Sequence, residues 1–300
     1  MQTPWGEFRV SDAHVHFFSH RFLASLSSQR GQTADQAARF LGWEPPPEDP
    51  AELARVWARE LDAHAVAKAA LIASAPGDEA SVAAAVAACP GRFFGYFMFN
   101  PLEERTAERV RAAFASGLRA VCLFPAMHRY AVGDERVQPV FEEAAGVPGR
   151  AVFVHCGVLS VGVRKKLGLP SPFDMRFSNP IDLHAVALRY PKLPFLVPHF
   201  GAGYFREALM LADQCSNVYL DTSSSNSWMR YEGLDLKTVF ARALHVAGAG
   251  RLLFGTDSSF FPRGWNAAVY EAQVRALEEL GIRARDAQSI FGGNLEGLFG

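Results

Sequence analysis

Five side chains that commonly bind metal ions or transfer protons lie in or directly after short apolar runs. His14 and His16 are two residues apart, so on a β-strand both imidazoles point to the same side and can bind one metal ion. His155, His199 and Asp257 each end or follow a further apolar run. Taken singly, His155 and His199 could be buried groups hydrogen-bonded to the backbone, and Asp257 could be a helix cap. Their joint placement favours one shared site.

Eight apolar runs predict strands at 8–15, 69–73, 93–99, 120–124, 151–155, 195–199, 218–221 and 252–254. Segments with helical periodicity alternate with them at 51–63, 79–88, 107–115, 137–145, 181–190, 205–214, 236–246 and 265–280. Eight strand and helix repeats predict an α/β protein with a (β/α)8 TIM barrel, whose strands all end on one rim. This rim would collect the five side chains.

Two connections are too long to be simple turns. The first follows the first strand as a lid insertion at 17–50, with a helix expected at 34–41 and three prolines at 45–47. The second runs from 158 to 179. Long loops of compact domains are often lids or binding loops, and we expect both to lie over the catalytic rim of a single domain that covers residues 1–300.

Composition excludes several classes of protein. Of the 300 residues, 49% are hydrophobic and 20% are charged, which is typical of a globular chain with a large core. The formal net charge is −1, so nothing favours nucleic acid as a partner. The sequence shows no signal peptide and no membrane span, which predicts a cytoplasmic protein. The four cysteines form no metal-binding pair and are expected to be reduced thiols.

Six short motifs resemble the amidohydrolase superfamily, and most closely its second family of metal-dependent hydrolases and of decarboxylases related to aminocarboxymuconate semialdehyde decarboxylase. They follow the family's order from one end of the chain to the other. The motifs are DAHVHF at 12–17, VHCG at 154–157, PHFG at 198–201, YLDTS at 219–223, FGTD at 254–257 and FGGN at 291–294. As a set they indicate a family, but they do not indicate a substrate.

The resemblance implies one divalent ion, commonly zinc, bound by His14, His16, His155 and Asp257. It also implies that His199 lies beside a metal-activated water. In this reading Asp257 takes the proton of the water, and His199 stabilises charge on the reacting oxygen. Relatives with two metals commonly use a lysine from the fourth strand, where this chain has Cys122. This difference favours a single metal, with Cys122 as a buried apolar thiol; a thiolate bridge is the alternative.

Several rim residues could bind a substrate. Arginines suit a carboxylate, and aromatic side chains can form an apolar pocket wall, although surface arginines and core aromatics often have no such role. The polar stretch 221–227 after the seventh predicted strand could line the site or simply turn the chain. The substrate-binding candidates are Phe17, Arg129, Arg164, Arg206, Trp228, Arg263 and Trp265.

The motifs therefore predict a metal-dependent hydrolase of an amide, ester or lactone bond in a small, carboxylate-bearing molecule. The alternative is nonoxidative decarboxylation of an aromatic or unsaturated carboxylic acid at the same ion, with a hydratase as a third outcome. A non-catalytic barrel is disfavoured because all five positions are filled. Decarboxylating relatives often pair so that a neighbour's arginine enters the site, and a homodimer is a corresponding expectation.

Overall fold

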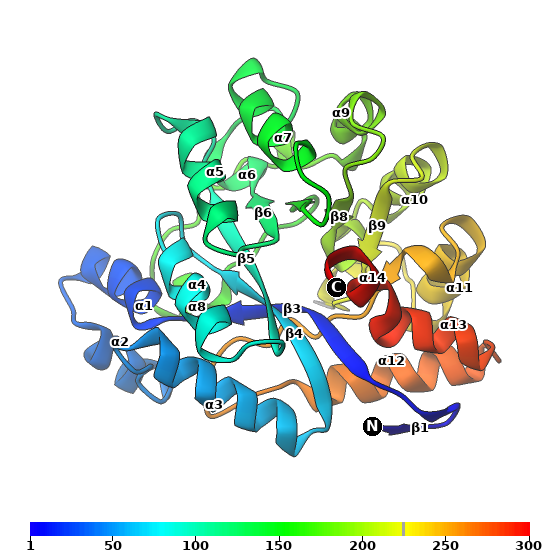
Figure 1. The fold of residues 1–300 in the computed structure, drawn as a ribbon, viewed down its shortest axis with the longest axis horizontal. Coiled ribbons are helices and arrows are strands. Elements are labelled where there is room, and N and C mark those ends of the chain that lie inside the picture. Colours follow the sequence, from blue (N-terminus) through cyan, green and yellow to red (C-terminus); the bar gives the residue numbers. More distant parts are fainter. Residues whose placement is uncertain (224–225) are drawn as a thin grey trace.

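The computed structural model describes residues 1–223 and 226–300. Eight parallel strands pair in chain order, and helices surround them, as Figure 1 shows. This confirms the predicted TIM barrel. The strands β3 to β10 are Val10–Phe17, Val66–Ala73, Phe93–Phe99, Ala120–Leu123, Ala151–Val154, Phe195–Val197, Val218–Asp221 and Leu252–Leu253. A short hairpin of β1 (Gln2–Thr3) and β2 (Gly6–Glu7) precedes them and was not predicted.

The barrel closes between its first strand and the segment that follows its last. The amide of Ala13 donates to the carbonyl of Phe254 at 2.7 Å, and the amide of His16 donates to that of Ser258 at 2.7 Å. The amide of Asp257 returns a bond to the carbonyl of His14 at 3.0 Å. These backbone bonds fix the register between the two ends of the sheet, and they hold Asp257 against the strand that carries His14 and His16.

The outer layer of helices agrees closely with the predicted ranges. The predicted helix 181–190 is divided, since a 3-10 turn at Pro180–Leu183 precedes α9. The last large helix begins at Ala267 rather than at Trp265, because side chains elsewhere hold both the backbone and the indole N–H of Trp265. The helices of this layer are α3 (Pro50–Ala63), α4 (Glu79–Ala88), α5 (Thr106–Ala115), α7 (Gln138–Ala145), α9 (His184–Arg189), α10 (Phe205–Gln214), α11 (Leu236–Val246), α12 (Ala267–Glu279), α13 (Ala284–Gln288) and α14 (Asn294–Phe299), and a short helix α6 (Pro125–His128) follows β6.

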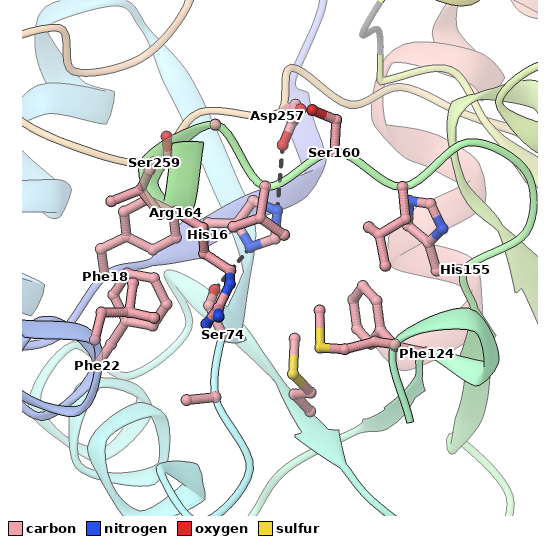
Figure 2. A pocket seen from close by; sticks show the side chains of 18 of the residues that line it. His16, Phe18, Phe22, Ser74, Phe124, His155, Ser160, Arg164, Asp257 and Ser259 are labelled. Carbon is pink, nitrogen blue, oxygen red and sulfur yellow. Dashed lines mark hydrogen bonds and ion pairs between the residues drawn. The ribbon is translucent and has the colours of Figure 1, made fainter. Parts of the chain in front are cut away.

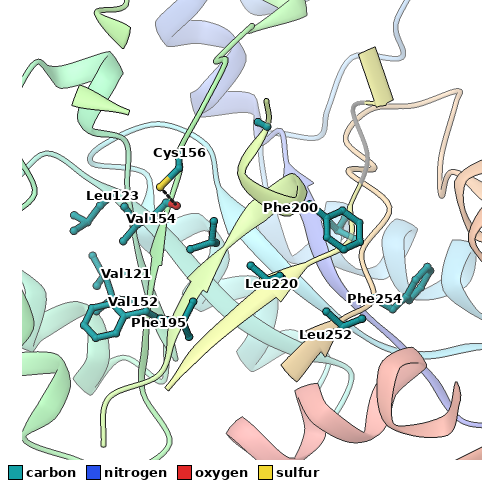
Figure 3. Packing of buried hydrophobic residues seen from close by; sticks show 14 of the residues in the cluster. Val121, Leu123, Val152, Val154, Cys156, Phe195, Phe200, Leu220, Leu252 and Phe254 are labelled. Carbon is teal, nitrogen blue, oxygen red and sulfur yellow. Dashed lines mark hydrogen bonds between the residues drawn. The ribbon is translucent and has the colours of Figure 1, made fainter. Parts of the chain in front are cut away.

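Apolar side chains fill two layers, one on each face of the sheet. Figure 3 shows part of the layer between strands and helices, where Val121, Val152 and Leu220 pack. Inside the barrel, Tyr96, Phe153 and other side chains form a second cluster, to which α14 contributes Leu295 and Phe299. Because both faces are buried, the strands are continuous apolar runs, which is the pattern that predicted them.

The segment 17–50 folds into α1 (His20–Ser27) and α2 (Ala34–Leu41), and it packs against α8 (Gly162–Lys166) of the second long connection. Phe22, Leu26 and Trp43 from the first segment share one apolar cluster with Val163 and Leu167 from the second. The two connections therefore form one cover. No helix within the described residues is long and apolar enough to span a membrane.

Candidate active site

A cavity of about 690 Å³ opens at the carboxyl ends of the strands. Side chains from both ends of the sheet reach it, as expected for a barrel whose strands end on one rim. Figure 2 shows His16, His155 and Asp257 around its open space. Its walls include all five residues that the motifs predicted for chemistry: His14, His16, His155, His199 and Asp257.

Three of these side chains form a compact cluster. His14 Nε2 and His16 Nε2 are 3.3 Å apart, and Asp257 Oδ1 lies 3.2 Å from His16 Nε2 and 3.7 Å from His14 Nε2. The ligand atoms of the three residues all lie within 4.8 Å of one another. Two imidazole nitrogens and a carboxylate oxygen at these spacings can bind a metal ion.

Buried groups hold His14 in one orientation. Its Nδ1 donates to Asp221 Oδ2 at 2.6 Å, so Nε2 is left to face the cluster. Burial lowers the pKa of His14, but the Asp221 carboxylate and its hydrogen bond more than offset this and raise it above its usual value. Gly255 permits the close approach, because a Cβ atom there would lie 2.8 Å from Asp221 Oδ1 and 2.9 Å from the Cβ atoms of His14 and Ser223.

His16 is oriented in a similar way by Ser74. The Ser74 hydroxyl donates to the carbonyl of Ile72 at 3.0 Å, so its oxygen accepts from His16 Nδ1 at 2.7 Å. His16 therefore also presents Nε2 to the cluster, and burial lowers its pKa. Burial would raise the pKa of Asp257, but its contact with His16 and the charge of His14 hold it below its usual value. The pair thus favours neutral imidazole beside ionised carboxylate.

His155 and His199 complete the ring of imidazoles. Their ring centroids are 5.5 Å apart, and that of His199 lies 5.0 Å from His14. His199 Nδ1 donates to the carbonyl of Ser223 at 2.8 Å, which leaves its Nε2 as an acceptor. Nδ1 of His155 is buried without a partner in the described part of the chain. Burial lowers the pKa of both histidines, and that of His155 falls well below its usual value.

Two of the predicted substrate-binding residues line the cavity. Arg164 donates from Nε and Nη2 to the carbonyl of Pro170, and from Nη2 to Gln29 Oε1 of the lid at 3.3 Å. Arg263 donates from Nη2 to the carbonyl of Asp257 at 3.1 Å and to Ser259 Oγ at 2.8 Å. Both guanidinium groups are therefore held in place by neutral oxygens at the cavity wall.

The other five candidates lie outside the described lining. The side chain of Phe17 is buried in the layer between strands and helices, because it points to the opposite side from His14 and His16. Arg129 donates to the carbonyl of Pro172, which itself lines the cavity.

The remaining three candidates have partners away from the cavity. Arg206 is exposed and forms an ion pair with Glu207. Trp228 is buried against Phe205, and the Trp265 indole donates a hydrogen bond to Asp12.

Comparison with known proteins assigns the chain to a family. A family model described as "Amidohydrolase" matches residues 11–300. The chain belongs to the amidohydrolase family. Among curated proteins, it is 27% identical over 168 residues to Protein fluG of Emericella nidulans, a match that covers 54% of this chain and 18% of that protein's length.

Solved structures show the same fold. A TIM-barrel protein from Bordetella bronchiseptica superposes with a TM-score of 0.65 at 22% identity, over 96% of this chain and 97% of that one. An amidohydrolase from Burkholderia multivorans, solved with bound zinc, has a TM-score of 0.62 at 17% identity, over 97% and 98% of the two chains. At these sequence identities the similarity shows a shared fold alone.

Asp12 and Ser74 were not among the predicted site residues, and Asp221 was predicted only as part of the polar stretch 221–227, although Asp12 and Asp221 lie in the quoted motifs. Asp12 accepts bonds from the amide of His14, from Thr256 and from the Trp265 indole, so it ties the first strand to the end of the last. Burial raises its pKa to about 6. The sequence pattern could have indicated Asp221, because it ends a predicted strand as His155 does. Of the polar stretch 221–227, residues 224 and 225 lie outside the described residues.

Cys122 is fully buried inside the barrel and is absent from the described lining of the cavity. Burial raises the pKa of its thiol well above the usual value. A neutral, buried thiol acts as a small apolar side chain. This environment supports the apolar role expected for Cys122 rather than the thiolate bridge.

Substitution of Asp221 tests how the cluster is oriented. Asp221→Asn removes the charge that holds His14 Nδ1, and we expect zinc affinity to fall roughly 10- to 100-fold without loss of the fold. Competition with a chromogenic chelator measures the affinity, and circular dichroism checks the fold. The control is Asp213→Asn, at an exposed position of α10. Equal affinity in the two variants would show that Asp221 does not orient the ligand.

Proposed function

We propose that the chain is a metal-dependent hydrolase that cleaves an amide, ester or lactone bond of a small, carboxylate-bearing molecule. The observation that carries the proposal is the convergence of His14 Nε2, His16 Nε2 and Asp257 Oδ1 at a cavity that His155 and His199 also line. Membership of the amidohydrolase family supports an enzyme that uses a metal. The type of bond that is cleaved and the class of substrate both belong to this proposal.

The residues present fit one divalent ion, and we propose zinc. His14, His16 and Asp257 supply nitrogen and carboxylate donors of the kind that zinc takes, and His155 is the fourth proposed ligand. His155 suits this role because burial keeps its imidazole neutral. When bound, such an ion acts as a Lewis acid and lowers the pKa of a water to about 7. A related amidohydrolase has been solved with zinc.

Two side chains would handle protons. Asp257 is ionised, so it can take the proton of the attacking water and pass it to the leaving group. His199 is neutral and already donates through Nδ1, so its Nε2 accepts a hydrogen bond from an O–H group in the cavity. If Nε2 takes the proton of that O–H group, the new N–H would stabilise the negative charge left on the oxygen. Arg164 and Arg263 are the candidates for binding the substrate carboxylate.

The role of His199 can be separated from that of a ligand by two substitutions. His199→Ala should keep its zinc and lose about 100-fold or more in kcat, since it removes a group that acts on the reacting atoms. His14→Ala should lose both zinc and turnover, since it removes a donor of the cluster. Elemental analysis and steady-state kinetics measure the two quantities. Unchanged zinc in His14→Ala, or full activity in His199→Ala, would contradict these assignments.

The reaction itself needs a test, because the decarboxylase alternative would use the same residues. The zinc-loaded protein is incubated in water enriched in oxygen-18 with carboxylate-bearing aryl esters and lactones, and separately with aromatic carboxylic acids. Hydrolysis places one heavy oxygen in the acid product and releases no carbon dioxide. Release of carbon dioxide without incorporation of the heavy oxygen would overturn the hydrolase proposal in favour of decarboxylation.

A further inference from the structure

A column of stacked aromatic rings forms one wall of the cavity. Phe22 stacks on Phe18 with ring centroids 4.2 Å apart, Phe18 on Trp43 at 5.7 Å, and Trp43 on Phe260 at 4.3 Å. All four residues line the cavity. The column joins the end of β3, the lid and the loop after β10. It is therefore an apolar wall whose parts come from distant segments of the chain.

Apolar side chains also form the opposite wall. Figure 2 shows Phe18 and Phe22 on one side of the open space and Phe124 with His155 on the other. Met98 and Met127 line the cavity as well, and methionine adapts its shape to flat apolar ligands. The cavity therefore has apolar surfaces on two sides.

Positive charge gathers at one end of the aromatic column. Arg263 Cζ lies 4.6 Å from the ring centroid of Phe260, and Lys166 Nζ lies 5.7 Å from it. Within residues 1–223 and 226–300, neither cation forms an ion pair. Nε and Nη1 of Arg263 also have no hydrogen-bond partner there. Asp257 is the carboxylate in the described lining, and it belongs to the histidine cluster.

The size of the cavity shows that more than a reacting group fits. A volume of about 690 Å³ equals the share of roughly 20 water molecules in liquid water. Filling this space with water would leave the two apolar walls hydrated, and an apolar molecule that displaces this water gains binding free energy. The charged end and the apolar walls are thus complementary to different parts of one ligand.

We propose that the cavity binds an organic anion with an extended apolar, flat body, which lies between the two walls and whose carboxylate binds Arg263 beside Phe260. The reacting bond then faces the histidine cluster, and this last clause rests on the proposed function. Arg263 is the specificity-determining residue, because backbone and hydroxyl oxygens already fix its guanidinium through Nη2 and leave Nη1 and Nε free to donate to a carboxylate. The Lys166 ammonium adds charge at the same end.

Binding of non-reacting probes to the zinc-loaded full chain tests the proposal by calorimetry. The probes are 2-naphthoate, its neutral analogue 2-naphthamide and the smaller anion benzoate. We expect 2-naphthoate to bind about ten-fold more tightly than each of the others, since one lacks the charge and the other lacks half of the apolar body. Arg263→Gln should abolish the preference for acid over amide. The control Arg242→Gln, at an exposed position of α11, should keep it.

Three results would overturn the proposal. Equal binding of 2-naphthoate and 2-naphthamide would contradict the proposed anion site. Equal binding of 2-naphthoate and benzoate would contradict the proposed preference for an extended apolar body. A preference for the acid that survives in Arg263→Gln but disappears in zinc-free His14→Ala would place the carboxylate at the histidine cluster instead. Since no turnover is measured, failure here is distinct from failure of the hydrolase proposal.

Discussion

The site depends on the backbone bonds that close the barrel. Asp257 lies more than 240 residues after His14 and His16, yet its amide donates to the carbonyl of His14, and the amide of His16 donates to that of Ser258. Without this closure the carboxylate would have no fixed position beside the imidazoles. The Asp12 carboxylate supports the same junction, because it accepts hydrogen bonds from Thr256 and from the Trp265 indole. The same contacts therefore close the barrel and hold Asp257 beside the two imidazoles.

The electrostatics of the site follow from burial balanced by partners. His155 and His199 have lowered pKa values because burial disfavours their charged forms, so both can act as neutral bases or ligands. His14 is the exception, since the buried Asp221 carboxylate raises its pKa. Asp221 in turn has a lowered pKa, because His14 and Ser223 offset the cost of burying it. A metal ion would replace the proton that this arrangement favours on His14.

Much of the fold and of the cluster could be predicted from sequence, for physical reasons. Strands buried on both faces are continuous apolar runs, and a polar residue at the end of such a run stands out, as His155 and His199 do. Alternation along a strand also places Phe18, rather than the predicted substrate-binding residue Phe17, on the side of His14 and His16. The position of the Arg206 side chain could not be predicted in this way, because its ion pair with the adjacent Glu207 depends on side-chain direction. Likewise, the Trp43–Phe260 contact depends on how the lid packs, which no local pattern predicts.

Folding should bring His14, His16 and Asp257 to one ion. The most direct test is an anomalous difference map of crystals loaded with zinc, collected on both sides of the zinc edge. We expect a single strong peak about 2.0–2.2 Å from His14 Nε2, His16 Nε2 and an oxygen of Asp257. A peak bound by other residues, or no peak at this cluster while zinc is present in solution, would contradict it.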